Sequence, residues 1–305
     1  MVSRRLFVLG LGSVAAASIL SPSLPSPGRG GEEDDVLAID PRMEGRTRGF
    51  ALQCDRSPWV EETGRTCGRV ITYRAGVEGR GSCVLLDRFG TVALTTHQVE
   101  DWLSSDGTRT VEAVVRFSPR PGEIVETKGL SDIRLHEGLD LAFASIDPAF
   151  VASADLMPVV WGAIPNVVVE TEIVAVGWAL GRDRLHAAQG VCRRFHDIDE
   201  QRYTSLGKSG SSGRFFCKIE ARLGAYPGMS GGAVFSGGAL VGIDNANSPA
   251  DDIPDLRFTP SWAVWDGYRK LYPDRAAEAV FAPGLRLDRQ PMPLSCVADP
   301  RAFSR

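Results

Sequence analysis

The sequence lacks any long cluster of lysine and arginine. It has 34 Lys and Arg against 38 Asp and Glu, which gives a net charge of −4 and a pI near 5.7. A nucleic-acid-binding surface concentrates positive charge, so we exclude nucleic acid as a partner. At 305 residues, with 43% hydrophobic side chains, the chain is long enough for two packed subdomains or one large domain.

Metal-binding cysteine patterns are also missing. No Cys-x-x-Cys pair occurs, and no cysteine lies within zinc-finger spacing of a second ligand. We therefore expect no metal and no other cofactor. An even number of cysteines in an exported chain is consistent with disulfides, and separate buried thiols are the alternative. The six cysteines are Cys54, Cys67, Cys83, Cys192, Cys217 and Cys296.

The apolar segment at the N-terminus is short for a membrane-spanning helix. Residues 6–20 are apolar or small and follow Arg4 and Arg5, whereas a spanning helix needs about 20 residues. This arrangement predicts an export signal, and its Ser-Arg-Arg-Leu-Phe-Val start resembles the twin-arginine type. An ordinary secretory signal and an uncleaved anchor are the alternatives. We assign 1–27 to the signal and 28–60 to a linker or extension, and expect a periplasmic or extracellular protein without stable membrane insertion after cleavage.

Long amphipathic helices are scarce. From residue 68 onward the apolar runs are short and strand-like, and turn residues separate them, as at 69–73, 82–86 and 91–95. Only residues 261–272 repeat large apolar side chains at helical spacing. The pattern predicts an all-β fold of sandwich or barrel type with one late helix.

One serine stands between glycines immediately before an apolar run. Residues 224–235 read Gly-Ala-Tyr-Pro-Gly-Met-Ser-Gly-Gly-Ala-Val-Phe, with the serine at 230. Glycine adopts positive φ in a sharp turn and leaves no Cβ in the path of an approaching carbonyl. Ser230 is therefore a candidate nucleophile, and the N–H groups of Gly228 and Ser230 are candidate oxyanion donors. A Gly-rich turn between strands is the alternative.

Histidine is rare, and no histidine follows Ser230. The segment 228–232 also fits the Gly-x-Ser-x-Gly pattern of α/β-hydrolases, but their basic histidine comes after the serine. The missing downstream histidine and the scarcity of helices argue against that fold. The order histidine, aspartate, serine is available instead, with His97 and Asp140 each next to a strand-like run. The remaining histidines, assigned to surface or structural roles, are His136, His186 and His196.

Three segments in this order resemble those of trypsin-like serine peptidases. Residues 95–99 (Thr-Thr-His-Gln-Val) resemble the family's Thr-x-x-His-Val segment, and residues 139–142 (Leu-Asp-Leu-Ala) its Asp-Leu-Ala segment. Residues 227–232 (Pro-Gly-Met-Ser-Gly-Gly) resemble its Gly-x-Ser-Gly-Gly segment. The resemblance covers about 67–265 and is greatest to the bacterial branch of high-temperature-requirement (HtrA) and glutamyl endopeptidases.

The resemblance implies two six-stranded antiparallel β-barrels with a C-terminal helix and a site between the barrels. His97 would act as general base and acid, Asp140 would orient it, and Ser230 would attack the substrate carbonyl. The implied function is an exported serine endopeptidase that cleaves proteins or peptides through an acyl-enzyme intermediate. The boundaries that we expect are 61–155 for the first barrel, 156–275 for the second barrel and helix, and 276–305 for a C-terminal tail.

The chain departs from the family in several places. Met229 stands where many members carry Asp or Asn, so activation by a new N-terminus paired with a carboxylate there is not available. No cysteine lies immediately after His97, so the disulfide that often staples the histidine loop in animal enzymes is missing. The chain after Trp265 is too short for the PDZ domain of many bacterial relatives. By position in the family, Cys192 and Cys217 lie on neighbouring strands, which predicts a disulfide between them.

The substrate pocket is less clearly indicated. No acidic residue lies in the few positions before Ser230, so a preference for Lys or Arg has little support. We expect a small or apolar substrate side chain, unless Asp244 faces the pocket. The residues expected to line it are Gly224, Ala225 and Tyr226 and the strand 241–245 with Val241 and Asp244.

Two other functions fit the same residues. One is a catalytically silent double barrel that serves as a binding module, in which Met229 deforms the oxyanion hole. The other is a carboxyl-ester hydrolase that uses the same three side chains. The sequence does not predict the oligomeric state.

Overall fold

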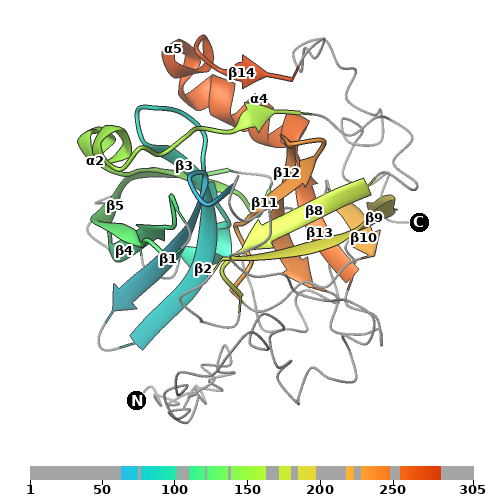
Figure 1. Ribbon diagram of the computed structural model, residues 1–305, viewed down its shortest axis with the longest axis horizontal. Helices are drawn as coiled ribbons and strands as arrows, with labels where there is room; N and C mark the ends of the chain where they lie inside the picture. Colours follow the sequence, from blue (N-terminus) through green and yellow to red (C-terminus); the bar gives the residue numbers. More distant parts are fainter. Residues whose placement is uncertain are drawn as a thin grey trace, which may run out of the picture.

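The computed structural model shows two β-structures joined by a shared core (Figure 1). The predicted signal, the extension up to residue 60 and the predicted tail beyond 282 lie outside the described residues. The structure describes residues 63–74, 77–100, 103, 110–120, 122–136, 139–162, 172–179, 185–196, 218–222, 228–247 and 255–282.

The first structure is a closed barrel of six strands, drawn blue to green in Figure 1. Its strands pair antiparallel in the order β1-β2-β3-β6-β5-β4, and β4 closes the barrel on β1. The strands are β1 (Cys67–Arg74), β2 (Val77–Leu85), β3 (Thr91–Leu94), β4 (Val111–Phe117), β5 (Val125–Leu135) and β6 (Ala142–Ser145).

The second structure contains a ring of six antiparallel strands. The order β11-β8-β9-β10-β13-β12 returns to its start because β11 also pairs with β12. Two further short strands, β7 (Val160–Trp161) and β14 (Val280–Phe281), add in parallel next to β12. The ring strands are β8 (Glu172–Gly177), β9 (His186–His196), β10 (Lys218–Arg222), β11 (Ala233–Ser236), β12 (Ala239–Asn247) and β13 (Asp255–Pro260).

Local sequence accounts for the β2–β3 hairpin. The Asp87 carboxylate accepts hydrogen bonds from the N–H groups of Phe89 and Thr91, which closes the turn. Gly90 has a φ of +83°, and a Cβ there would lie 2.3 Å from the carbonyl oxygen of Ile146. Only glycine fits this turn, which sets the start of β3 and so the place of the histidine that follows it.

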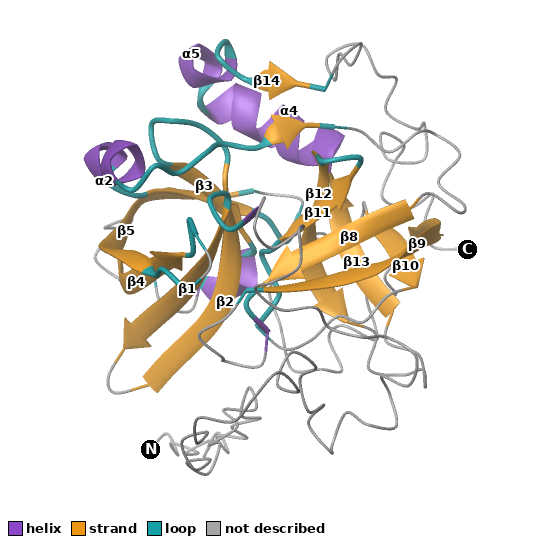
Figure 2. Ribbon diagram, in the orientation of Figure 1, coloured by secondary structure: helices purple, strands orange, loops and turns teal. Residues whose placement is uncertain are grey.

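The α-helices labelled in Figure 2 lie outside the strands of the two barrels. The predicted helix at 261–272 is confirmed as α4 (Ser261–Leu271), followed by the single turn α5 (Pro273–Ala276). The short α2 (Pro148–Ser153) was not predicted; Asp147 caps it by accepting a hydrogen bond from the N–H of Ala149. The one-turn 3-10 helix η1 (Thr96–Gln98) follows β3.

Two hydrophobic clusters are formed by the described residues. One fills the first barrel and contains Cys83, Val115 and Phe117. The other joins side chains of both barrels to those of α4, and the indole of Trp265 packs edge-on against that of Trp161. Because this second cluster is continuous across the two barrels, their relative position is part of the folded core.

The prediction of an all-β double barrel with a C-terminal helix is therefore confirmed. The prediction of a disulfide between Cys192 and Cys217 is not supported, since Cys192 is a free, buried thiol on β9. The strand register places Ala221 opposite Cys192. Cys217 lies outside the described residues. A sequence pattern gives neighbouring strands, but it does not give the register on which a disulfide depends.

Candidate active site

The three predicted side chains come from turns next to strands. His97 lies in η1, directly after β3, and Asp140 lies two residues before β6. Ser230 lies in the turn that precedes β11. β3 and β6 pair with each other, so the histidine and the aspartate emerge from neighbouring strands of the first barrel.

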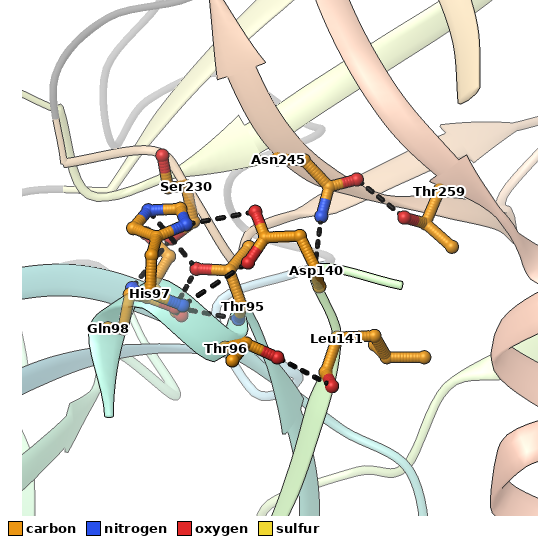
Figure 3. Close-up of polar contacts among 10 residues, drawn as sticks. Thr95, Thr96, His97, Gln98, Asp140, Leu141, Ser230, Asn245 and Thr259 are labelled. Carbon is orange, nitrogen blue, oxygen red and sulfur yellow. Dashed lines mark hydrogen bonds and ion pairs between the residues drawn. The ribbon is translucent and has the colours of Figure 1, made fainter. Parts of the chain in front are cut away.

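His97 and Asp140 form a close pair (Figure 3). Imidazole Nδ1 lies 2.9 Å from Asp140 Oδ2, and the backbone N–H of His97 donates to Asp140 Oδ1 at 3.2 Å. Asp140 is 2% exposed. A carboxylate that binds both the backbone and the ring of one residue fixes that ring, and it holds the tautomer whose Nδ1 carries the proton.

The outer nitrogen of the imidazole keeps its lone pair. Nε2 lies 3.3 Å from Thr95 Oγ1, which lies closer, at 2.8 Å, to Gln98 Oε1. A threonine hydroxyl has one proton, and the nearer acceptor takes it. In the tautomer held by Asp140, Nε2 is therefore available to accept a proton from another group.

Ser230 is linked to the histidine turn through its backbone. Its carbonyl oxygen accepts a hydrogen bond of 2.9 Å from Gln98 Nε2, one residue along from His97 (Figure 3). Within the described part of the chain, no hydrogen bond joins Ser230 Oγ to His97. Such bonds are often long in a protein without substrate and shorten when substrate binds.

The loop before Ser230 leaves two backbone donors free. Neither the N–H of Gly228 nor that of Ser230 donates to a group among the described residues, and Gly228 has a φ of +94°. Gly231 N donates to Asp244 O at 2.7 Å and Gly232 N to Met229 O at 2.8 Å, which fixes the loop. Met229 is fully buried, and its Cβ lies close to Gly177.

A polar link that the sequence analysis missed joins the second barrel to Asp140. Asn245 Nδ2 donates to the backbone oxygen of Asp140 at 2.6 Å, and Thr259 Oγ1 donates to Asn245 Oδ1 at 2.6 Å. All three residues are at most 2% exposed. No local signal marks such a link, because β12, β13 and the Asp140 turn meet only in the folded chain.

The predicted pocket is described in part. Val241 and Asp244 are both 1% exposed, and Gly224, Ala225 and Tyr226 lie outside the described residues. The assignment of these five residues to a substrate pocket stays a prediction.

The structure describes two of the other predicted histidines, His136 and His186, in full. His136 donates its backbone N–H to Leu141 O, and His186 is fully buried in β9. Among the described residues, no group of three or more His, Cys, Asp or Glu side chains is arranged to hold a metal. In the same part of the chain, no helix is long and apolar enough to cross a membrane.

Two β-barrels with a histidine–carboxylate pair and a serine turn at their junction define the chymotrypsin-like class of folds. The chain belongs to the trypsin-like peptidase domain family, whose model matches residues 66–243. No curated protein matches the chain.

Several solved structures are similar to this chain. Deg5 shares 18% sequence identity at a TM-score of 0.53, over 70% of this chain and 92% of its own. The active form of the Rv3671c protease from M. tuberculosis shares 14% sequence identity at a TM-score of 0.54, over 82% of this chain and 95% of its own. The HtrA-type protease AlgW, solved with a tripeptide, shares 17% sequence identity at a TM-score of 0.50, over 70% of this chain and 64% of its own. At these identities the likeness concerns the fold.

Proposed function

We propose that this chain is an exported serine endopeptidase that uses Ser230, His97 and Asp140. The observation that carries the proposal is the imidazole of His97, held by the buried Asp140 carboxylate at 2.9 Å and placed beside the Ser230 turn. Membership of the trypsin-like peptidase family supports it further.

In the proposed reaction His97 Nε2 removes the proton of Ser230 Oγ while Oγ bonds to the carbonyl carbon of the substrate. The resulting tetrahedral intermediate collapses when the carbon–nitrogen bond breaks, and the imidazolium returns the proton to the leaving amine. Water then repeats the two steps on the acyl-enzyme, with His97 as base and acid again. Asp140 keeps the ring orientation and stabilises the imidazolium.

The two free backbone donors fit the charge that develops in this reaction. The N–H groups of Gly228 and Ser230 would donate to the oxyanion of the tetrahedral intermediate. The positive φ of Gly228 and the buried side chain of Met229 support this assignment. They argue against a silent binding module whose oxyanion loop Met229 deforms.

Labelling with a fluorophosphonate tests the nucleophile. We expect a covalent adduct on Ser230 in the folded protein, and none in Ser230→Ala. The absence of an adduct under conditions that label a control protease would contradict both enzymatic functions and favour the binding module.

Profiling separates the peptidase from a carboxyl-ester hydrolase. A peptide library digested by the wild-type protein, with Ser230→Ala as the blank, is expected to yield cleaved peptide bonds after small or apolar residues. Hydrolysis of activated esters without cleavage of any peptide would identify an esterase instead. The residues found at the cleavage site would also test the pocket assignment of Val241 and Asp244.

The N-terminal sequence supports export, with residues 1–27 as a twin-arginine signal. In the proposed division of the chain, an extension at 28–60 precedes the two barrels at 61–155 and 156–275, and a tail follows at 276–305. We expect a periplasmic or extracellular mature protein. Replacing Arg4 and Arg5 by lysine would retain the full-length precursor in the cytoplasm, as followed by fractionation and mass spectrometry of the N-terminus. Unchanged export of that variant would point to the ordinary secretory route.

A further inference from the structure

The side chain of Gln98 uses all of its hydrogen-bonding capacity between the histidine turn and the serine turn. Oε1 accepts from Thr95 N at 2.9 Å and from Thr95 Oγ1 at 2.8 Å. Nε2 donates to Ser230 O at 2.9 Å and to Ser82 O at 3.3 Å. Because the backbone N–H of Thr95 can only donate and the two carbonyls can only accept, the orientation of the amide is unambiguous.

Two glycines leave the space that this amide occupies. Gln98 is 8% exposed. A Cβ on Gly81 would lie 1.4 Å from Gln98 Nε2, and one on Gly231 would lie 2.5 Å from Gln98 Oε1. Glycine at both positions is what lets the side chain reach from the first barrel to the serine turn.

The contacts of Gln98 and Ser82 fix the backbone of the serine turn. Ser82 Oγ donates to Gly228 O at 2.8 Å, and Ser82 N donates to Ser230 O at 2.8 Å, beside the bond from Gln98. With Met229 O accepting from Gly232 N, three successive carbonyls are engaged. In a trans peptide the N–H points opposite to the C=O, so holding these carbonyls leaves the Ser230 N–H on the other side.

The trypsin-like family offers a contrast at this position. Animal members staple the histidine loop with a disulfide from the residue after the histidine, and here that residue is Gln98. Its amide ties the same turn to Ser82 and, in addition, to the carbonyl of the candidate nucleophile.

We infer that Gln98 is a positioning residue that aligns His97 with Ser230 and its oxyanion donors, in place of a disulfide staple. The inference rests on the proposed peptidase function. Gln98 touches neither the substrate nor the reacting atoms; it acts through the backbone of the Ser230 turn and through Thr95.

Two variants test this inference. Gln98→Met keeps the length of the side chain and removes all four hydrogen bonds. Gln98→Glu keeps the shape and the acceptor oxygen, but its ionised carboxylate faces the two carbonyls that the amide donated to. For Gln98→Met we expect kcat to fall by up to about 100-fold with little change in KM, because a displaced turn misaligns the reacting groups. The rate of fluorophosphonate labelling of Ser230 should fall in proportion.

The pH dependence of Gln98→Glu distinguishes positioning from a general loss of stability. A protonated carboxyl can donate to Ser230 O, so the activity of this variant relative to wild type should rise as the pH falls. A ratio independent of pH, at a temperature where both proteins are folded, would contradict the inference.

Val115→Ala serves as the matched control for stability. Val115 is fully buried in the core of the first barrel, in the cluster that does not extend to the second barrel. It should lower the melting temperature while leaving kcat near the wild-type value. If Gln98→Met retains wild-type kcat and labelling, the inference is wrong while the peptidase function stands. If the wild-type protein itself is not labelled, both the inference about Gln98 and the proposed peptidase function are wrong.

Discussion

The two halves of the candidate site are held in different ways. The histidine half is fixed by side chains: the Asp140 carboxylate holds His97, and Gln98 Oε1 holds Thr95. The serine half is held through its backbone atoms: Gly228 and Gly231 have positive φ, and the N–H groups of Gly231 and Gly232 hold the turn. Its carbonyls also accept hydrogen bonds from the side chains of Ser82 and Gln98. The histidine half should therefore respond most to isosteric polar changes, and the serine half to any added Cβ.

The largest effect is expected for an isosteric change in the histidine half. Asp140→Asn replaces one acceptor oxygen by an NH₂ group and favours the wrong imidazole tautomer, so kcat should fall by about 10⁴-fold. Asp132→Asn is the control, since the Asp132 carboxylate is exposed and pairs with Arg134 on β5. Steady-state kinetics on a peptide substrate measure both. Near-normal activity of Asp140→Asn would mean that side chains do not hold this half.

A single methyl group should disrupt the serine half. In Gly231→Ala the new Cβ would lie 2.0 Å from Ser82 O, at a φ of +84°. Gly238→Ala is the matched control, because Gly238 has a φ of +79° with nothing within 4 Å of the added Cβ. The control carries only the backbone strain, about 1 to 2 kcal/mol. We expect Gly231→Ala to lose clearly more stability in chemical denaturation and to abolish labelling of Ser230; equal losses would rule out the steric explanation.

A smaller loss of stability is expected when the hydrogen bond between α4 and the first barrel is removed. Tyr268 Oη donates to Asp87 Oδ2 at 2.7 Å in a buried contact, so Tyr268→Phe should lower the free energy of unfolding by about 2 kcal/mol. Tyr272→Phe, on the same segment, removes a buried hydroxyl that has no hydrogen-bond partner among the described residues, and should be neutral or stabilising. Urea denaturation of both variants tests this, and equal effects would contradict it.

The smallest effect on stability is expected from the ionisation of the buried thiols. Cys67 lies in the cluster that joins the two barrels, and Cys83 lies in the cluster of the first barrel. Burial raises the pKa of Cys67 to about 12 from its ordinary value of 9.0, and burial together with the neighbouring Cys67 raises that of Cys83. A folded pKa above the unfolded one contributes stability that is complete below pH 9 and is lost as the pH rises from 9 toward 12. The contribution of each thiol should fall by about 1 kcal/mol between pH 9 and pH 10, because the unfolded thiol is half ionised at pH 9 while the folded one stays protonated.

Thermal unfolding of wild type and of Cys67→Ala over this pH range measures that loss. The difference in stability between the two proteins should shrink above pH 9. A difference that stays constant would show that the thiol does not titrate differently in the folded and unfolded chains.

Several structural features followed from short stretches of sequence. The glycine at 90 and Asp87 predict the turn that ends at β3, and the apolar repeat in 261–272 predicts α4, because both depend on neighbours in the chain. The two-residue strands β7 and β14 had no such signal, since only their parallel pairing makes them strands. The predicted Cys192–Cys217 disulfide failed for a similar reason, because it depended on a register.

The order of His97, Asp140 and Ser230, with the family segments around them, was enough to name the candidate site, because each residue is marked by its immediate neighbours. Only the tertiary structure brought Gln98, Ser82, Asn245 and Thr259 to it. A hydrogen bond between residues 132 positions apart, such as that from Gln98 to Ser230, leaves no local pattern, since it arises where the two barrels meet. The residue types at the site are thus determined by local sequence, and their alignment by the packing of the barrels.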